Sequence, residues 1–217
     1  MRFLSLLSCL LFPVILQAQS FELGLFTGFA NYQGDLAHDQ IEIGATSLSF
    51  GGLARYEIVP AVKIRGSLYY GLISGDDAFG TTATRDRGWS FQSSLVELAV
   101  VGEFHPLGKS RYRSGGVFRS SVSPYFATGL AFLSIDSEVT VTDPADAGLF
   151  PEPGTTSVAS SVPLILGIRL DAYESFSLGF EWGWRMAMTD YLDGVSKNGR
   201  ANRDWYLFIG ATASYVF

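Results

Sequence analysis

Hydrophobic residues alternate with small or polar residues along much of this chain. The segment FSLGFEWGWRMAM (176–188) shows the pattern most clearly, because every second residue from Phe176 to Met188 is large and apolar. The residues between them are small or charged and include Glu181 and Arg185. Successive side chains of a strand point to opposite sides of a sheet. Strict alternation therefore predicts a β-strand with two chemically different faces.

The same two-residue period recurs with turn-forming residues between its occurrences, and it predicts eight strands. Each is close to the roughly 9–11 residues that a tilted strand needs to cross a bilayer. In the fifth strand the alternation is weak and does not show which face points outward. The predicted ranges are 21–30, 48–58, 62–72, 90–104, 124–135, 162–170, 176–188 and 205–217.

Short and long connections alternate between these strands. VPA (59–61) and DAYES (171–175) are short, whereas the connections after the first, third, fifth and seventh strands are long and polar. Outer-membrane barrels have short periplasmic turns and long outer loops. One connection breaks this rule, since HPLGKSRYRSGGVFRSS (105–121) is expected on the periplasmic side but is long and basic. The pattern predicts an all-β, eight-stranded antiparallel transmembrane barrel.

A soluble sandwich or lipocalin-like barrel is the alternative for an all-β chain. It would turn the charged face toward water and would need polar residues on the outer face of most strands. Here the residues opposite the apolar face are Gly, Ser, Thr and charges of both signs, which suits a narrow, filled lumen. We therefore expect Trp182 and Trp184 to face lipid, and Glu181 and Arg185 to face the lumen.

The composition agrees with a membrane barrel. Charged residues make up 17% of the chain, against about 25% in soluble proteins. The mean hydropathy is +0.22, yet no segment beyond the N-terminus offers the roughly 18 uninterrupted apolar residues of a membrane helix. The formal net charge is -6. An acidic chain argues against nucleic acid as a partner.

The N-terminal segment MRFLSLLSCLLFPVILQAQS predicts a cleaved signal peptide. Arg2 precedes an apolar run over 3–16, and small or polar residues follow it. We expect cleavage near Ala18, with 1–19 as the signal peptide and 20–217 as the barrel domain. A lipoprotein box at Cys9 is the alternative, but cleavage there would leave an apolar tail. The mature chain then has no cysteine, so it offers no disulfide or thiol nucleophile.

The alternation also places charged side chains of both signs inside the barrel. An eight-stranded barrel leaves only enough room for side chains to fill it. The simplest interpretation is a neutralised network, in which removal of one buried partner would cost about 3–5 kcal/mol. A catalytic carboxylate pair or a proton path is the alternative. The predicted lumenal charge network contains Arg55, Glu57, Lys63, Arg65, Glu97, Glu103, Arg169, Glu181 and Arg185.

The sequence offers little for catalysis or metal binding. A barrel lipase or deacylase would need a His with a Ser and an acid at one site. Of the two histidines, His38 falls in the first long loop and His105 at the periplasmic rim, and neither is predicted beside a Ser/acid pair. GDD (75–77) and DYLD (190–193) could touch Ca²⁺, although solvation explains acidic loops more simply. We predict no catalytic, cofactor-binding or metal-binding residues, and no cofactor.

Two connections carry charge of one sign. The segment 136–160 has five acidic residues and no Lys or Arg, which is typical of a solvated surface loop. The connection over 105–121 is basic, and solvation or contact with anionic headgroups is one explanation. Docking onto a periplasmic partner is the sharper hypothesis. Its candidate contact residues are Lys109, Arg111, Arg113 and Arg119.

Several segments resemble an outer-membrane barrel family of the Bacteroidota. They are NYQGDL (31–36), YGLISGDDA (70–78), SFQSSLVELAVVGEF (90–104) and LGFEWGWRMAMTDYLDGVS (178–196), in order over about 22–195. The final ATASYVF also resembles the C-terminal assembly signal of outer-membrane proteins. The best-known members of the family are the small barrel component of the type IX secretion and gliding machinery.

The resemblance implies a non-enzymatic barrel of the bacterial outer membrane. It also implies that outer-membrane lipid surrounds the barrel and that the periplasmic side contacts secretion-machinery proteins. The family has no established catalytic residues, and the acidic loop and the basic turn of this chain depart from it. Two alternatives remain: a small porin-like or ligand-binding barrel with a water-filled lumen, and a lipid-modifying enzyme with a Ser or His beside an acid.

Overall fold

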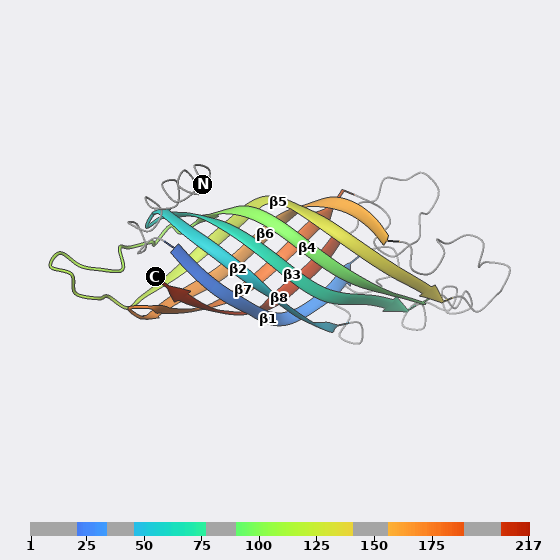
Figure 1. The fold of residues 1–217 in the computed structure, drawn as a ribbon, viewed down its shortest axis with the longest axis horizontal. Helices are drawn as coiled ribbons and strands as arrows, with labels where there is room; N and C mark the ends of the chain where they lie inside the picture. The colour runs from blue at the N-terminus through green and yellow to red at the C-terminus, as the bar shows by residue number, and fades with distance from the viewer. Residues whose placement is uncertain (1–20, 34–45, 77–89, 141–155, 189–204) are drawn as a thin grey trace, which may run out of the picture.

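The computed structural model describes residues 21–33, 46–76, 90–140, 156–188 and 205–217. They form one closed antiparallel barrel in which neighbours along the chain pair and β1 also pairs with β8 (Figure 1). The predicted all-β, eight-stranded barrel is confirmed. Within these ranges no helix is long and apolar enough to span a membrane. The strands are β1 (Phe21–Gln33), β2 (Ser47–Val59), β3 (Val62–Asp76), β4 (Ser90–Phe104), β5 (Ser121–Thr140), β6 (Thr156–Tyr173), β7 (Phe176–Ala187) and β8 (Trp205–Val216).

Several predictions concern segments outside the described residues. These are the signal peptide, His38, the DYLD segment and the part of the acidic loop over 141–155. They remain predictions.

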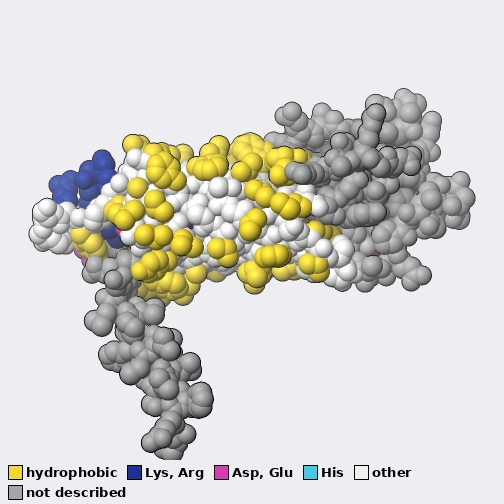
Figure 2. Space-filling view, turned by 90° about the horizontal axis from the view of Figure 1, so that it is seen from above, with side chains coloured by type: hydrophobic (Ala, Val, Ile, Leu, Met, Phe, Trp, Pro, Cys, Tyr) yellow, Lys and Arg dark blue, Asp and Glu magenta, His cyan; other side chains and the backbone are white. Residues whose placement is uncertain are grey.

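The outer wall of the barrel is apolar. Side chains along each strand alternate between buried and exposed, as the two-residue period predicts. Leu25 is 71% exposed and Phe132 is 62% exposed, although both are large and hydrophobic. Figure 2 shows hydrophobic side chains spread over the wall between the two ends, with Lys and Arg gathered at one end. A closed barrel with an apolar wall and buried charges is the architecture of the bacterial outer membrane, and this protein is an outer-membrane barrel.

The facing of β5, which the sequence left open, is visible in the structure. Phe126 and Phe132 point outward, whereas Tyr125 and Leu133 are buried inside. The pattern is blurred in the sequence because small residues, such as Ala127, line the inner face, and apolar residues occur on both faces. Leu207 has the position on β8 that the alternation turns outward, yet it is buried.

The ends of the barrel follow the predicted alternation of short and long connections. Pro60–Ala61 joins β2 to β3, and residues 174–175 join β6 to β7. β6 is longer than predicted, so Asp171 belongs to the strand rather than to the turn. These turns lie at the same end as the 105–120 connection and the C-terminus (Figure 1). By the rule for outer-membrane barrels, this end is periplasmic.

The lumen contains two layers of side chains. Ion pairs occupy the part nearer the periplasmic end. An apolar cluster fills the part nearer the outer end, and most of it comes from the outer halves of β3, β4, β5 and β8. The sequence predicted small and charged residues inside but not this cluster. Its largest members are Phe26, Tyr69, Ile73, Phe91, Leu95, Leu133, Ile135, Tyr206 and Phe208.

Candidate functional site

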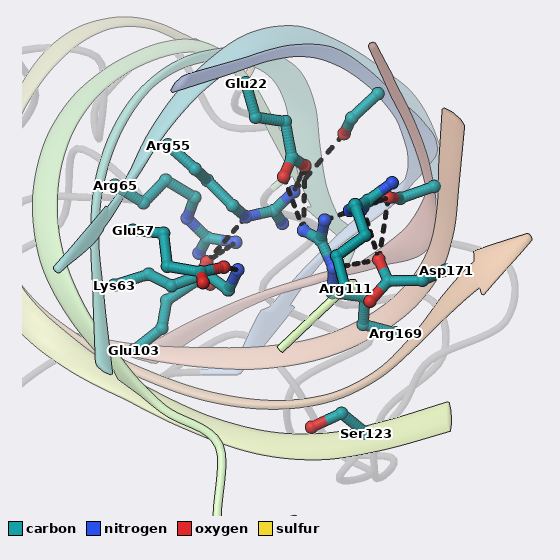
Figure 3. Close-up of polar contacts among 12 residues, drawn as sticks. Glu22, Arg55, Glu57, Lys63, Arg65, Glu103, Arg111, Ser123, Arg169 and Asp171 are labelled. Atoms are coloured by element: carbon teal, nitrogen blue, oxygen red, sulfur yellow. Dashed lines mark hydrogen bonds and ion pairs between the residues drawn. The ribbon is translucent and has the colours of Figure 1, made fainter. Parts of the chain in front are cut away.

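Arg55 of β2 lies near the centre of the periplasmic charge layer and contacts three carboxylates. Figure 3 labels two of them, Glu22 and Glu103. Its Nε donates to Glu103 Oε1 at 2.9 Å, and its Nη1 donates to Glu22 Oε1 at 2.8 Å. Its Nη2 donates to Glu181 Oε1 at 3.0 Å. These partners come from β4, β1 and β7, so one guanidinium ties together strands on opposite sides of the lumen.

Glu181 of β7 is the acceptor shared by the largest number of buried donors. Besides Arg55, the guanidinium of Arg65 forms a very short ion pair with it. The hydroxyl of Tyr125 donates to its Oε1 at 2.6 Å. Arg65 also lies 3.2 Å from Glu103, so Glu103 and Glu181 share both arginines. A buried carboxylate is stable only with such partners, because burial removes its hydration.

A second branch continues from Glu22 to the periplasmic mouth. Arg169 of β6 donates from Nη1 to Glu22 Oε2 at 2.6 Å and from Nε to Asp171 Oδ1 at 2.9 Å. Ser177 accepts a further hydrogen bond from Arg169 at 2.9 Å. Asp171 in turn accepts from Arg111 of the periplasmic connection at 2.6 Å. The charge layer is therefore continuous from the middle of the lumen to its mouth.

Two pairs lie outside this continuous network. Toward the outer end, Arg185 lies 3.4 Å from Glu97 and 4.7 Å from the Phe208 ring centroid. The hydroxyl of Tyr206 donates to Glu97 at 2.6 Å. At the periplasmic rim, Lys63 forms a very short ion pair with Glu57, whose side chain is 33% exposed.

The nine residues predicted for the lumenal network all lie on the inner face, with Glu57 the least buried. The prediction missed Glu22 and Asp171. Glu22 has an inward position on β1, so the two-residue alternation could have identified it. Asp171 was missed because it was assigned to a turn. With Arg111, the charges inside the described barrel balance at six cations and six anions: Arg55, Lys63, Arg65, Arg111, Arg169 and Arg185, against Glu22, Glu57, Glu97, Glu103, Asp171 and Glu181.

The expectation that His105 has no Ser/acid partners is wrong. Its Nδ1 lies 3.2 Å from Ser123 Oγ, and its Nε2 lies 3.1 Å from Glu103 Oε2. The pairing register of β4 and β5 brings these residues together, because His105 directly follows β4 and Ser123 lies at the start of the adjacent β5. A nucleophilic serine must reach its substrate, but Ser123 is 5% exposed and the Tyr125 ring stacks on His105 at 4.8 Å. Glu103 is also held by Arg55, so we interpret this contact as structural.

The periplasmic connection between β4 and β5 contains an ordered hairpin over 111–119. The Arg113 amide donates to Val117 O at 3.0 Å, and the Arg119 amide donates to Arg111 O at 2.8 Å. Gly115 and Gly116 form its tip with φ of 103° and 78°, a region that favours glycine. The hairpin projects away from the barrel along its long axis (Figure 1).

Arg111 anchors this hairpin to the barrel. Besides Asp171, it donates to Ser177 Oγ at 2.6 Å and to the carbonyl oxygens of Tyr173 and Glu174, each at 2.9 Å. Partial burial lowers the pKa of the Arg111 guanidinium, and the Asp171 carboxylate opposes this effect. Arg111 was predicted as a partner contact, but its guanidinium is turned into the mouth of the barrel.

The other predicted contact residues of the connection lie at its surface. Lys109 and Arg113 are exposed, and Arg119 is partly exposed. No ion pair is found for these three side chains within the described part of the chain. Figure 2 shows Lys and Arg side chains gathered at one end of the molecule.

A polar cavity of about 180 Å³ lies between the hairpin base and the charge layer. Arg55, Lys63 and Arg111 line it together with Glu22 and Glu57. All five charges have ion-pair partners, so the cavity presents a balanced lining rather than a site for one sign of charge. Among the described residues, no group of three or more His, Cys, Asp or Glu could hold a metal ion.

Comparisons with known proteins concern the fold. The crystal structure of Neisserial surface protein A matches with a TM-score of 0.48 and 12% identity, over 91% of this chain and 97% of that chain. OprG, an outer-membrane protein of Pseudomonas aeruginosa, matches with a TM-score of 0.47 and 10% identity, over 92% and 98%. Ail, the attachment invasion locus protein of Yersinia pestis, matches with a TM-score of 0.47 and 11% identity, over 90% and 97%.

The chain also matches a family model across its whole length. The description of that model is "Domain of unknown function (DUF6089)", and the match covers residues 1–217. None of the curated proteins compared with the chain is significantly similar to it.

Proposed function

The chain belongs to the DUF6089 family, and because that description names no activity, we propose a function from the geometry. We propose that the protein is a non-enzymatic, non-conducting barrel that holds a basic hairpin in the periplasm for a protein partner. The observation that carries the proposal is the hairpin over 111–119, which is anchored to a filled barrel through Arg111.

The filled lumen supports a structural role over a porin role. An open pore needs a continuous path of water, but Arg65 is 0% exposed and Glu181 is 2% exposed in the periplasmic layer. The apolar cluster above them adds a second barrier, since ions pass hydrophobic constrictions only when these are wetted. The interior of an eight-stranded barrel is just wide enough for side chains to fill it or for one small ligand.

The form of the hairpin supports a docking role. Backbone hydrogen bonds and the Tyr112–Phe118 ring contact hold its two arms together. The exposed Lys109 and Arg113 and the 65% exposed Val117 give it a basic surface with an apolar element. A prearranged surface lowers the ordering cost of binding, and its positive charge would steer an acidic partner.

We propose that the partner is a periplasmic protein of a secretion machine, as the resemblance to the type IX secretion and gliding barrels implies. The resemblance alone supplies this identity. The geometry supports only the proposed direction of the contact, at the periplasmic end, and its proposed sign, from a basic hairpin toward an acidic partner.

A small ligand-binding barrel is the second candidate, and the 180 Å³ cavity at the periplasmic mouth favours it. Its lining carries charges of both signs, so a zwitterionic molecule would match it better than a simple anion. A porin-like function is testable in the same preparation, because a continuous lumen would give single-channel conductance in planar bilayers.

The test uses the full-length protein solubilised from membranes. Lys109, Arg113 and Arg119 are changed to Gln, and Arg111 is left intact because it anchors the hairpin. The matched control changes Arg85, Arg87 and Lys197 to Gln, three cations that lie in the sequence between β3 and β4 and between β7 and β8. We expect the hairpin variant to lose co-purifying periplasmic proteins and the control to keep them. Equal recovery from both variants, or conductance by the wild-type barrel, would contradict the proposal.

A further inference from the structure

An apolar groove of about 730 Å³ runs across the outer wall of the barrel. It lies among side chains that face lipid, such as Leu25, Phe50 and Leu68, which are 71%, 59% and 54% exposed. Almost all of the lining is apolar. Most of the lining faces lipid, and the buried Phe26 and Tyr69 of the apolar cluster also border it. No part of the proposed function depends on this groove.

Strand register explains why a hollow forms here. Two neighbouring rows of outward residues cross the strands at right angles to them. Small side chains or glycine occur at four places in these rows, between larger residues. One row is Leu178–Ala213–Leu25–Gly52–Leu68 and the next is Ala211–Thr27–Phe50–Tyr70–Val96.

Gly52 lies at the base of the groove and has free space above its Cα atom. A Cβ added there would meet only the Gly24 carbonyl oxygen, at 3.9 Å, so no neighbour fills the space above it. Ala213 lies two strands away in the same row. Phe50 and Tyr70, whose rings lie 5.2 Å apart, form a wall in the second row.

The dimensions of the groove select its occupant. From Leu178 on β7 to Val96 on β4 it spans five strand intervals, or about 24 Å at roughly 4.8 Å per interval. Dividing 730 Å³ by that length gives a mean cross-section of about 30 Å², which corresponds to a width of about 5.5 Å if the cross-section is square. A helix with its side chains is about 10–12 Å wide and does not fit. A methylene chain, with carbon contacts at about 3.5–4.0 Å, does fit.

We propose that this groove is a binding site for one acyl chain of a bilayer phospholipid. The groove is continuous with the lipid-facing wall, so hydrocarbon reaches it without crossing water. Its lining offers almost no polar surface to a protein backbone, which disfavours a second barrel or a membrane-spanning peptide. The bound acyl chain lies oblique to the membrane normal, because the rows run perpendicular to strands that are themselves tilted by about 35–45°.

The test fills the groove and measures bound lipid by native mass spectrometry. Wild-type protein in mild detergent is incubated with 1-palmitoyl-2-oleoyl-phosphatidylethanolamine, and the population carrying one lipid is followed as detergent is increased. Gly52→Leu and Ala213→Leu place side chains in the groove and should lower retention by about tenfold or more. Gly102→Leu is the matched control, since Gly102 also faces outward with nothing within 4 Å but lies outside the groove. Equal retention by Gly52→Leu and Gly102→Leu overturns the proposal.

A second measurement uses the wild-type barrel alone and so does not depend on the folding of any variant. Phosphatidylethanolamine with a diazirine in its acyl chain is photolysed on the barrel in vesicles, and labelled peptides are mapped. Labelling concentrated on β1, β2 and β8 around the two rows supports the site. Uniform labelling of the outer wall overturns it, as would a covalent dimer or a second polypeptide held at the same residues.

Discussion

Replacement of Glu181 by Gln tests the charge layer at its most connected residue. Gln keeps the shape of the side chain but removes its negative charge, so the network gains an unbalanced buried cation. Arg55, Arg65 and Tyr125 each lose a charged acceptor. Hydrogen bonds to charged groups contribute about 1.5–3 kcal/mol each, and loss of one partner of a buried ion pair costs about 3–5 kcal/mol.

The expected loss of unfolding free energy is near the lower end of that range, at about 3 kcal/mol, since Arg55 and Arg65 both keep Glu103. That corresponds to a change of roughly 150-fold in the folding equilibrium. Urea unfolding in phospholipid vesicles, followed by tryptophan fluorescence, measures it. The matched control is Glu57→Gln at the periplasmic rim. Its side chain is 33% exposed, so loss of its pair with Lys63 should cost less, about 1 kcal/mol.

A double variant sharpens the measurement. Arg65→Met in the Glu181→Gln background removes one of the buried cations that have lost the Glu181 carboxylate, so it should recover part of the lost unfolding free energy. A coupling energy between the two sites of about 0.5–3 kcal/mol is expected for contacting residues. If Glu181→Gln costs no more than Glu57→Gln, the buried network does not hold the barrel together and the reasoning is wrong.

Three further predictions concern the wall and the hairpin. Leu166 points outward near the middle of β6, so Leu166→Arg should lower the unfolding free energy in vesicles by about 2–4 kcal/mol. Val158→Arg, nearer the outer end, should lower it by about 0–1 kcal/mol. Equal costs would count against this placement in the membrane. Gly115→Ala and Gly116→Ala strain a backbone with positive φ by about 1–3 kcal/mol, so the Arg119 amide should exchange faster with solvent than in Ser114→Ala. Arg111→Gln should speed exchange of the Arg113 and Arg119 amides without changing unfolding of the barrel as much as Glu181→Gln does; unchanged exchange would show that Arg111 does not anchor the hairpin.

Alternation along the sequence was enough to predict the strands and most of their faces. The predicted range of the fourth strand, 90–104, is the observed one, and the other ranges differ mainly by extensions at their ends. The face of β5 could not be predicted, because apolar residues occupy both sides of that strand. Its inner side packs against other buried residues such as Val101 and Ile165, and only the closed structure reveals that packing.

The sequence by itself determined which residues point inward on every strand except β5, since the side chains of a strand alternate with a local period of two. It did not determine which inward residues meet. Arg169 and Glu22 pair across 147 positions of sequence, and His105 reaches Ser123 and Glu103 only because β4 and β5 pair in one particular register. Arg111 turns into the barrel mouth for a similar reason, because its partners lie on β6, β7 and the turn between them. Closure and register are properties of the whole sheet, so only the tertiary structure decided these contacts.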